Sequence, residues 1–225
     1  MHNWEISPKQ AVQEQKGLQE KLRIQSFQQE VKLVGGADIS YNRFSSTAYA
    51  GIVILRFPEM EIIEKQTAVA TMHFPYVPGL LSFREIPPIA EAWKKIKTRP
   101  DVMVLDGHGM AHPRRMGIAS HFGIVFQIPT IGCAKKVLTG SFDMPENQKG
   151  DTSPLMDKEE QIGTVLRTKP NVKPVFISPG HLMDFKSAID IIKPCIKGYR
   201  IPEPTRQAHL LVNEARIKNT KGHTS

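Results

Sequence analysis

The stretch VMVLDGHGMAHPRR, residues 102–115, decides the fold class. Four apolar residues are followed by the single carboxylate of Asp106, a glycine-rich turn, His112 and the pair Arg114-Arg115. A short apolar run that ends in a polar turn is typical of a buried strand in an α/β protein, where functional groups gather at the carboxyl ends of parallel strands. Asp106 therefore lies where a functional side chain is expected, although a simple capping role at the strand exit stays open at this point.

The segments around this strand predict a mixed sheet flanked by helices. β-branched residues and short links indicate an antiparallel meander of three strands at residues 31–40, 48–57 and 61–70. Helices are expected at about 8–27, 81–96, 114–126, 184–193 and 205–217, and further strands at 101–107, from 129, at 162–168 and at 174–180. We expect these later strands to be parallel. The polar, turn-rich residues 141–160 predict an exposed loop.

Length and charge limit the classes of protein that fit. The chain has 225 residues, which suits a single domain at residues 1–218 followed by a disordered tail at 219–225. Lys and Arg outnumber Asp and Glu by 30 to 22, a net charge of +8. Such an excess favours a polyanionic partner, nucleic acid above all, although a basic surface on an unrelated enzyme gives the same number.

Cysteine usage and hydropathy indicate a cytoplasmic protein, which we expect to be a monomer. Cys133 and Cys195 are isolated, without the spacing of a zinc site or of a disulfide framework. No apolar run approaches the length of a membrane span, and the first residues lack the pattern of a signal peptide. We therefore expect no membrane partner.

Three carboxylates are candidate metal ligands. Asp38 interrupts an apolar strand, where an unpaired charge is costly to bury, unless it faces solvent on an edge strand. Asp106 ends another strand, whereas Glu85 taken alone is an ordinary solvated helix residue. Carboxylates suit hard cations such as Mg²⁺ or Mn²⁺, and the scarcity of cysteine argues against zinc.

Basic side chains follow several of the predicted strands. His112 comes shortly after Asp106, the pair Lys135-Lys136 follows the strand that begins at 129, and His181 follows the strand at 174–180. If these strands are parallel, the basic groups meet at one edge of the sheet, where they can bind a phosphodiester. Neither a P-loop nor a dinucleotide-binding glycine motif is present.

Five sequence blocks resemble one known family. They are GADISY (36–41), PYVPGLLSFREIPPI (75–89), LDGHGMAHPRRMGIASHFG (105–123), PTIGCAKK (129–136) and SPGHLMDF (178–185). In this order they resemble endonuclease V, the deoxyinosine 3′ endonuclease. The PYVPG block with FRE, and DGHGMAHPRR, are its most specific motifs. The resemblance implies a ribonuclease-H-like fold in which the first strand of the meander lies beside the strand that ends at Asp106.

The resemblance also implies a site. Asp38, Glu85 and Asp106 are expected to hold Mg²⁺, with Mn²⁺ as a substitute, and His112, Lys135 and His181 to surround the reacting phosphate. Residues Pro75, Tyr76, Val77, Pro78 and Gly79 match the wedge that enters the duplex where the deaminated base is flipped out. Cleavage is expected at the second phosphodiester bond 3′ to the lesion, which leaves 3′-hydroxyl and 5′-phosphate ends.

The chemistry of the residues is compatible with this activity. Lys135 can stabilise developing negative charge, whereas His112 or His181 could orient water or protonate the leaving group, a choice that stays open. Arg114, Arg115 and Lys136 are expected to contact phosphates of single- or double-stranded DNA that contains deoxyinosine. Two alternatives remain: an endonuclease acting on inosine in RNA, and a non-catalytic nucleic-acid-binding module with the same fold.

Overall fold

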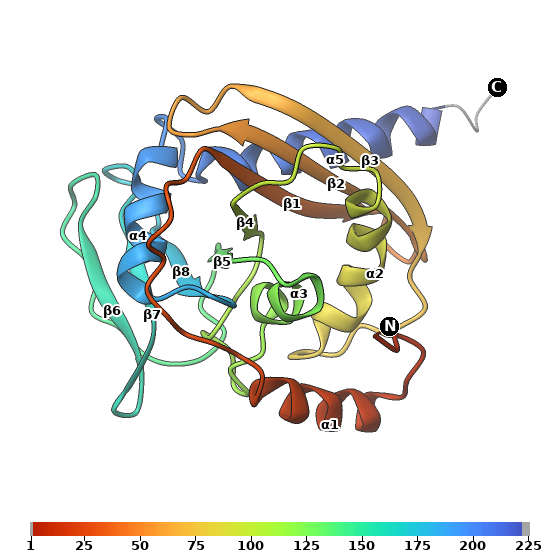
Figure 1. The fold of residues 1–225 in the computed structure, drawn as a ribbon, viewed down its shortest axis with the longest axis horizontal. Helices are drawn as coiled ribbons and strands as arrows, with labels where there is room; N and C mark the ends of the chain where they lie inside the picture. Colours follow the sequence, from red (N-terminus) through yellow and green to blue (C-terminus); the bar gives the residue numbers. More distant parts are fainter. Residues whose placement is uncertain (1, 222–225) are drawn as a thin grey trace.

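The computed structural model describes residues 2–221, which form an eight-stranded sheet with helices on both faces (Figure 1). The strands are β1 (Leu33–Tyr41), β2 (Thr47–Arg56), β3 (Ile62–Thr71), β4 (Val102–Leu105), β5 (Thr130–Ala134), β6 (Thr152–Asp157), β7 (Glu160–Leu166) and β8 (Val175–Pro179). The helices are α1 (Pro8–Gln19), α2 (Leu81–Trp93), α3 (Ile118–Phe126), α4 (Phe185–Ile192) and α5 (Glu203–Lys221), with a 3₁₀ turn at Lys193–Cys195.

The sheet has the strand order β3-β2-β1-β4-β5-β8-β7-β6. As predicted, β1, β2 and β3 form an antiparallel meander, and β4 and β5 run parallel to β1. The prediction that the later strands are parallel is wrong for the two predicted at 162–168 and 174–180, because β8 is antiparallel to β5 and β7 is antiparallel to β8. Strand β6, which pairs antiparallel with β7, was not predicted as a strand. The reversal at β8 decides which of the predicted site residues meet.

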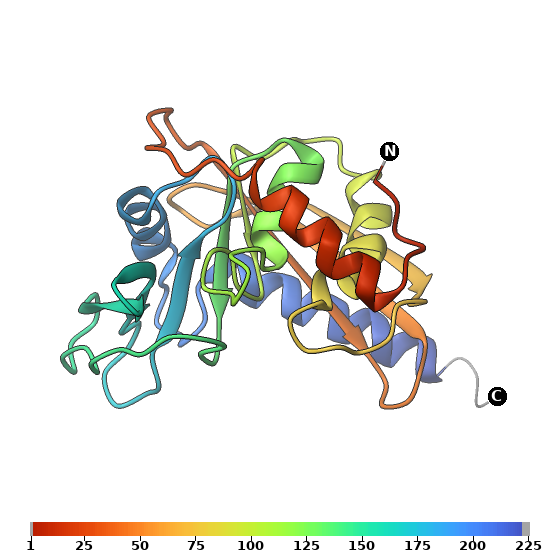
Figure 2. The ribbon, with the colours of Figure 1, turned by 90° about the horizontal axis from the view of Figure 1, so that it is seen from below.

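Alternating side chains of the central strands supply two separate hydrophobic cores. Val102 and Val104 of β4 belong to the core beneath α4 and α5, whereas Met103 and Leu105 belong to the core beneath α2 and α3. This period of two is what a strand buried on both faces requires. Figure 2 shows the resulting layers, with α1, α2 and α3 on one side of the meander and α5 on the other.

Close packing of α5 on β1 depends on a glycine. A Cβ built on Gly36 would lie 1.9 Å from the carbonyl oxygen of Pro204, near the start of α5. Any larger residue at position 36 would therefore push the helix away from the strand. The glycine precedes Asp38 by two residues, so the same close approach brings α5 to that carboxylate.

Several element boundaries differ from the sequence predictions. The first helix ends at Gln19 instead of near residue 27, since Phe27 and Val31 lie in an extended segment that packs on the core beneath α4. Helix α2 continues through Pro87 and Pro88, because buried apolar side chains on its inner face offset the backbone hydrogen bonds that proline removes.

The segment predicted as a loop at 141–160 contains a strand. Its residues Thr152–Asp157 pair with β7 as β6, at the edge of the sheet. An edge position tolerates Pro154 and the polar residues that suggested a loop. The last helix extends to Lys221, beyond the predicted end at 217, and residues 222–225 of the expected tail lie outside the described residues. Within residues 2–221, no helix combines the length and apolar character needed to cross a bilayer.

Candidate active site

Asp38 and Asp106 lie side by side because they follow paired positions of two parallel strands. Ala37 in β1 pairs with Leu105 in β4, so the next residue along each strand is an aspartate. The backbone N–H of Asp106 donates to the carbonyl oxygen of Ala37 at 3.3 Å. The two side chains are only 11% and 15% exposed. Two partly desolvated carboxylates at neighbouring strand ends need a cation to offset their repulsion.

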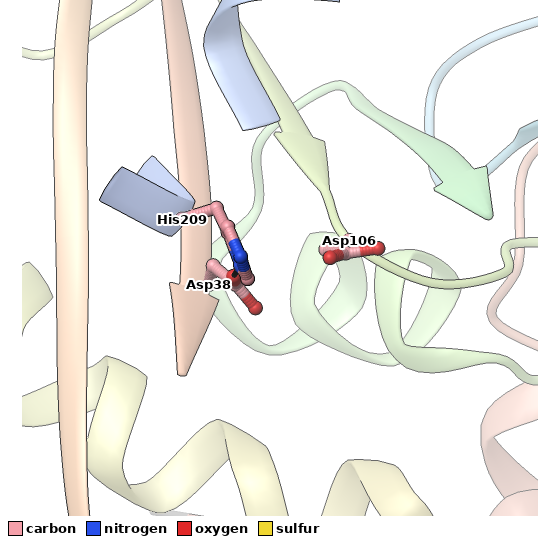
Figure 3. Close-up of side chains that lie close together, drawn as sticks. All are labelled: Asp38, Asp106 and His209. Carbon is pink, nitrogen blue, oxygen red and sulfur yellow. Dashed lines mark hydrogen bonds and ion pairs between the residues drawn. The ribbon is translucent and has the colours of Figure 1, made fainter. Parts of the chain in front are cut away.

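His209 completes this cluster from helix α5 (Figure 3). Its Nδ1 lies 2.8 Å from Oδ2 of Asp38, and Asp38, Asp106 and His209 each offer one ligand atom within 4.8 Å of the others. The hydrogen bond with Asp38 raises the pKa of His209. His209 is not recognisable as a site residue from the sequence, because nothing near it in the chain indicates that α5 crosses β1 at Asp38.

Glu85 reaches the same region from helix α2. It lines a cavity of about 420 Å³ together with Asp106, Tyr76 and Gly79. Burial, together with repulsion by Asp38 and Asp106, raises the pKa of Glu85 to about 8. Glu85 is not among the residues whose ligand atoms approach within 4.8 Å. Asp38 and Asp106 nevertheless repel the negative charge of Glu85, so Glu85 belongs to the same acidic cluster.

Lys135 is the cation already present at the cluster. It follows β5, and its Nζ forms an ion pair with Oδ2 of Asp106. Burial alone would lower the pKa of Lys135, but attraction and hydrogen bonding by Asp106 outweigh burial and raise it. Lys135 therefore stays protonated, with its charge beside the carboxylates where a phosphate would lie.

The segment Pro75–Gly79 projects one aromatic side chain into solvent. Tyr76 is 63% exposed, whereas Val77 packs inward against the small core that contains Leu80 and Phe83. Gly79 has φ +77°, a conformation that favours glycine. A stiff turn between two prolines thus presents the tyrosine at the rim of the cavity.

Three donors converge on the carbonyl oxygen of Gly79. They are Nε2 of Gln15 at 3.0 Å, Nε2 of His112 at 3.0 Å and Nη2 of Arg114 at 2.8 Å. The Gln15 side chain is buried and comes from α1, so the end of the segment is attached to two distant parts of the chain. This network holds Tyr76 in place.

His112 is occupied on both ring nitrogens. A carbonyl oxygen only accepts, so Nε2 donates to Gly79, and Nδ1 accepts from the backbone N–H of Arg114 at 3.1 Å. Burial, with the nearby positive charge of Arg114, lowers the pKa of His112 to about 4. The structure therefore places a neutral His112 in the wall of the cavity that Asp106 and Glu85 also line, and its expected role beside the phosphate stays a prediction.

The two arginines expected at phosphates are engaged within the protein. Nε of Arg114 donates to Oε1 of Gln15 at 2.6 Å, in addition to its bond with Gly79. Arg115 forms ion pairs with Asp157 at 2.8 Å and Glu160 at 2.7 Å, and its side chain is 15% exposed. Both guanidinium groups thus connect the glycine-rich turn to other elements. Lys136 differs from them, since it is exposed and lines the cavity.

His181 does not reach the acidic cluster. Its backbone pairs with Thr130, at the start of β5, whereas Lys135 follows the end of that strand. Because β8 is antiparallel to β5, the residue after β8 lies at the opposite edge of the sheet from Asp106. Its Nδ1 instead accepts from the backbone N–H of Arg23 at 3.3 Å. The expectation that His181 meets the reacting phosphate is corrected accordingly.

The fold and the site define a class. An antiparallel meander followed by two parallel strands, with one carboxylate within the first strand beside another directly after the fourth, is the arrangement of a ribonuclease-H-like nuclease. The fold class predicted from the sequence is confirmed.

Within this class, the chain belongs to the Endonuclease V family. The family model for Endonuclease V matches residues 16–210. The chain is 46% identical to the Endonuclease V of Myxococcus xanthus, over 95% of this chain and 91% of the relative.

Solved structures agree with this assignment. The structure of Endonuclease V from Bacillus subtilis has a TM-score of 0.93 at 31% identity, covering 99% of this chain and 98% of the other. The Endonuclease V of Ciona intestinalis, in complex with a 24mer DNA containing an inosine followed by a ribo-adenosine, has a TM-score of 0.82 at 31% identity, covering 93% and 98% of the two chains.

Proposed function

We propose that this chain is a divalent-metal-dependent endonuclease that recognises deoxyinosine in DNA and hydrolyses the second phosphodiester bond 3′ to it, leaving 3′-hydroxyl and 5′-phosphate ends. The observation that carries the proposal is the acidic cluster, whose members Glu85 and Asp106 line a cavity of about 420 Å³ together with Tyr76. Family membership and the inosine-containing DNA bound to the Ciona relative support the same substrate.

The donor set of the cluster fits a hard divalent cation. Asp38, Asp106 and His209 offer mainly oxygen ligands in one place, and Glu85 stands beside them. Burial and repulsion by Asp38 raise the pKa of Asp106, and burial and repulsion by Asp38 and Asp106 raise the pKa of Glu85, which is consistent with negative charge that a bound cation would balance. Mg²⁺, with Mn²⁺ as a substitute, would be held by these residues and supply Lewis-acid charge at the reacting phosphate.

The protein's own groups perform the remaining tasks. Lys135 places a fixed positive charge beside Asp106, where it stabilises charge that develops on the phosphate. Tyr76 fills the gap that a flipped base leaves in the stack, and the cavity behind it receives that base. The volume of about 420 Å³ is in the range of small-molecule pockets. Lys136, exposed at the cavity, contacts the phosphate backbone.

The acidic cluster also argues against a binding-only module. Carboxylates facing a polyanion weaken its binding, so a protein that only binds nucleic acid gains nothing from this arrangement. RNA is a second candidate substrate, because the nucleic acid in the Ciona complex carries a ribo-adenosine after the inosine.

One cleavage assay tests the proposal. Matched strands that contain inosine in DNA, inosine in RNA or no inosine are incubated with the protein in Mg²⁺, in Mn²⁺ or in chelator, and the product ends are mapped. We expect metal-dependent cleavage of inosine DNA at the second phosphodiester bond 3′ to the inosine. Equal cleavage of strands without inosine, or cleavage in chelator, would contradict the proposal. Faster cleavage of RNA would make RNA the preferred substrate.

A further inference from the structure

Phe44 is an aromatic side chain that folding leaves in solvent. It lies in the turn at residues 42–46 between β1 and β2, and it is 94% exposed. Its φ of +65° is a left-handed conformation that is unfavourable for a bulky residue. Neither burial nor backbone preference therefore explains a phenylalanine at this position.

The turn that carries Phe44 is held in a defined shape. The backbone N–H of Ser45 donates to the carbonyl oxygen of Asn42 at 3.0 Å, and Arg216 of α5 donates to the Asn42 side chain at 2.8 Å. The carbonyl oxygen of Ser46 accepts from Met72 at 2.7 Å, which ties the turn to the segment after β3. An aromatic ring on such a turn is pre-organised for contact, so binding would order little additional chain.

Two arginines line the surface cavity that contains Phe44. The guanidinium carbon of Arg43 lies 4.8 Å from the centre of the Phe44 ring. The guanidinium of Arg84 of α2 lies over the Tyr41 ring at 5.4 Å, and its Nη1 donates to the carbonyl oxygen of Phe74 at 2.7 Å. Among residues 2–221, neither arginine forms an ion pair with a carboxylate, and Nε of Arg84 is buried without a hydrogen-bond partner. An exposed ring that shares a surface cavity with two cations matches a nucleotide, whose base stacks and whose phosphate is negative.

Tyr76 connects this surface to the candidate active site. It lines the surface cavity with Phe44, and it also lines the cavity that contains Glu85 and Asp106. Figure 2 shows the β1–β2 turn (orange) and the segment after β3 (gold) along the same lower side of the molecule. Tyr76 is thus shared by the two cavities, so a strand whose base is turned into the inner cavity has Phe44 within the neighbouring one.

We propose that the turn at 42–46 is a second stacking platform, on which Phe44 stacks with the base of a nucleotide next to the lesion in the cleaved strand. Arg43 and Arg84 contact the phosphate of that nucleotide. Because the strand is then held in both of the cavities that Tyr76 lines, the platform favours the bent strand path that a flipped base requires. This inference rests on the proposed function, since it takes inosine-containing nucleic acid as the ligand.

The test compares Phe44→Ala with the unmodified protein on inosine strands, single-stranded and duplex, in Ca²⁺ to slow cleavage. Loss of one base–aromatic stack predicts a Kd roughly 5- to 100-fold higher on both substrates. Phe44→Trp should restore the affinity. Met144→Ala is the matched control, because Met144 is 61% exposed and lies in the loop before β6, the strand at the opposite edge of the sheet. This variant should bind inosine strands with the Kd of the unmodified protein.

A fluorescent base analogue reports the contact directly. 2-Aminopurine is placed on the 5′ or the 3′ side of the inosine in separate strands. The unmodified protein should quench it at one of these positions, and Phe44→Ala should abolish that quenching. An unchanged Kd for Phe44→Ala overturns the inference. A loss of affinity confined to duplex DNA also overturns it, because that result would place the complementary strand on Phe44. Failure of the unmodified protein to cleave inosine strands contradicts the proposed function instead.

Discussion

The guanidinium of Arg114 donates to the carbonyl oxygen of Gly79 at 2.8 Å and to Oε1 of Gln15 at 2.6 Å. One side chain thereby links the glycine-rich turn after β4, the end of the Tyr76 segment and helix α1. An arginine that follows an active-site strand in a basic protein is readily interpreted as a phosphate ligand. Here its hydrogen bonds are made within the protein, so we expect Arg114 to help position the segment that carries Tyr76.

Replacing Arg114 by alanine is therefore expected to lower stability and lesion recognition together. A hydrogen bond from a charged group contributes about 1.5–3 kcal/mol to stability, and the variant would leave the Gln15 amide without one of its partners. Thermal unfolding and the Kd for inosine DNA measure the two effects. The salt dependence of binding should not change.

Lys136 provides the matched comparison for that variant. Its side chain is exposed at the cavity, so Lys136→Ala should leave the melting temperature unchanged and make the slope of log K against log salt shallower by about 0.9, the value for one phosphate contact. If Arg114→Ala shows the shallower slope with normal stability, Arg114 contacts phosphate and the positioning role is wrong.

Asp38→Ala and Asp106→Ala should each abolish cleavage while inosine DNA is still bound. Both carboxylates are candidate metal ligands, whereas the Tyr76 segment and the cavity wall are held by other residues. A gel-shift assay beside a nicking assay separates the two properties. Cleavage by either variant at near the normal rate in Mg²⁺ would contradict the metal assignment.

The sequence was sufficient for the parts of this site that depend on local pattern. Asp38 and Asp106 are recognisable because each interrupts an apolar strand, and pairing of the two strands places them together. The position of His209 depends on how α5 crosses the sheet at Gly36, which no local pattern encodes. His181 was placed at the wrong edge, because an apolar run does not reveal whether its strand is parallel or antiparallel.

The ion pairs and hydrogen bonds that Arg115 forms within the protein could not be predicted from the sequence either. Arg115 forms ion pairs with Asp157 at the end of β6 and with Glu160 at the start of β7. The sequence of this region predicts a turn-rich loop. A cation near an active-site motif is interpreted by its charge alone until its neighbours are known. A mixed sheet flanked by helices was predictable because it depends on hydrophobic periodicity, which is local, whereas the ribonuclease-H-like fold was expected from the resemblance of five ordered sequence blocks to a known family.

Tyr76→Ala is expected to weaken binding to inosine DNA more than binding to undamaged DNA. The ring is exposed at the rim of the cavity, and stacking of an aromatic side chain on a base contributes roughly 1–3 kcal/mol. Competition binding with matched duplexes measures the difference. Equal losses on both duplexes would mean that Tyr76 only packs its own segment, and Tyr76→Phe should retain the lesion preference in either case.

The metal-free protein is expected to lose stability as the pH rises from about 6.5 to about 9. The pKa of Glu85 is raised to about 8 in the folded state, so the folded protein holds this proton more tightly than the unfolded chain. Its stabilising contribution is complete below the ordinary glutamate pKa and is lost as the pH rises through 8. Thermal unfolding in chelator across this range measures the loss.

Glu85→Gln and added metal are the two controls. The glutamine variant cannot ionise and should show a flatter pH profile, with a residual slope in the same direction from Asp106 and His209, whose pKa values are also raised. Mg²⁺ binds the ionised carboxylates, so it should stabilise the unmodified protein most at high pH. Below about pH 6.5 the sign reverses, because several buried neutral histidines must be protonated on unfolding and together outweigh Glu85: His108 and His112, whose pKa values are lowered to about 4, and His121, whose pKa is also lowered. A melting temperature that is constant from pH 6.5 to 9 in chelator would show that Glu85 is not coupled to Asp38 and Asp106.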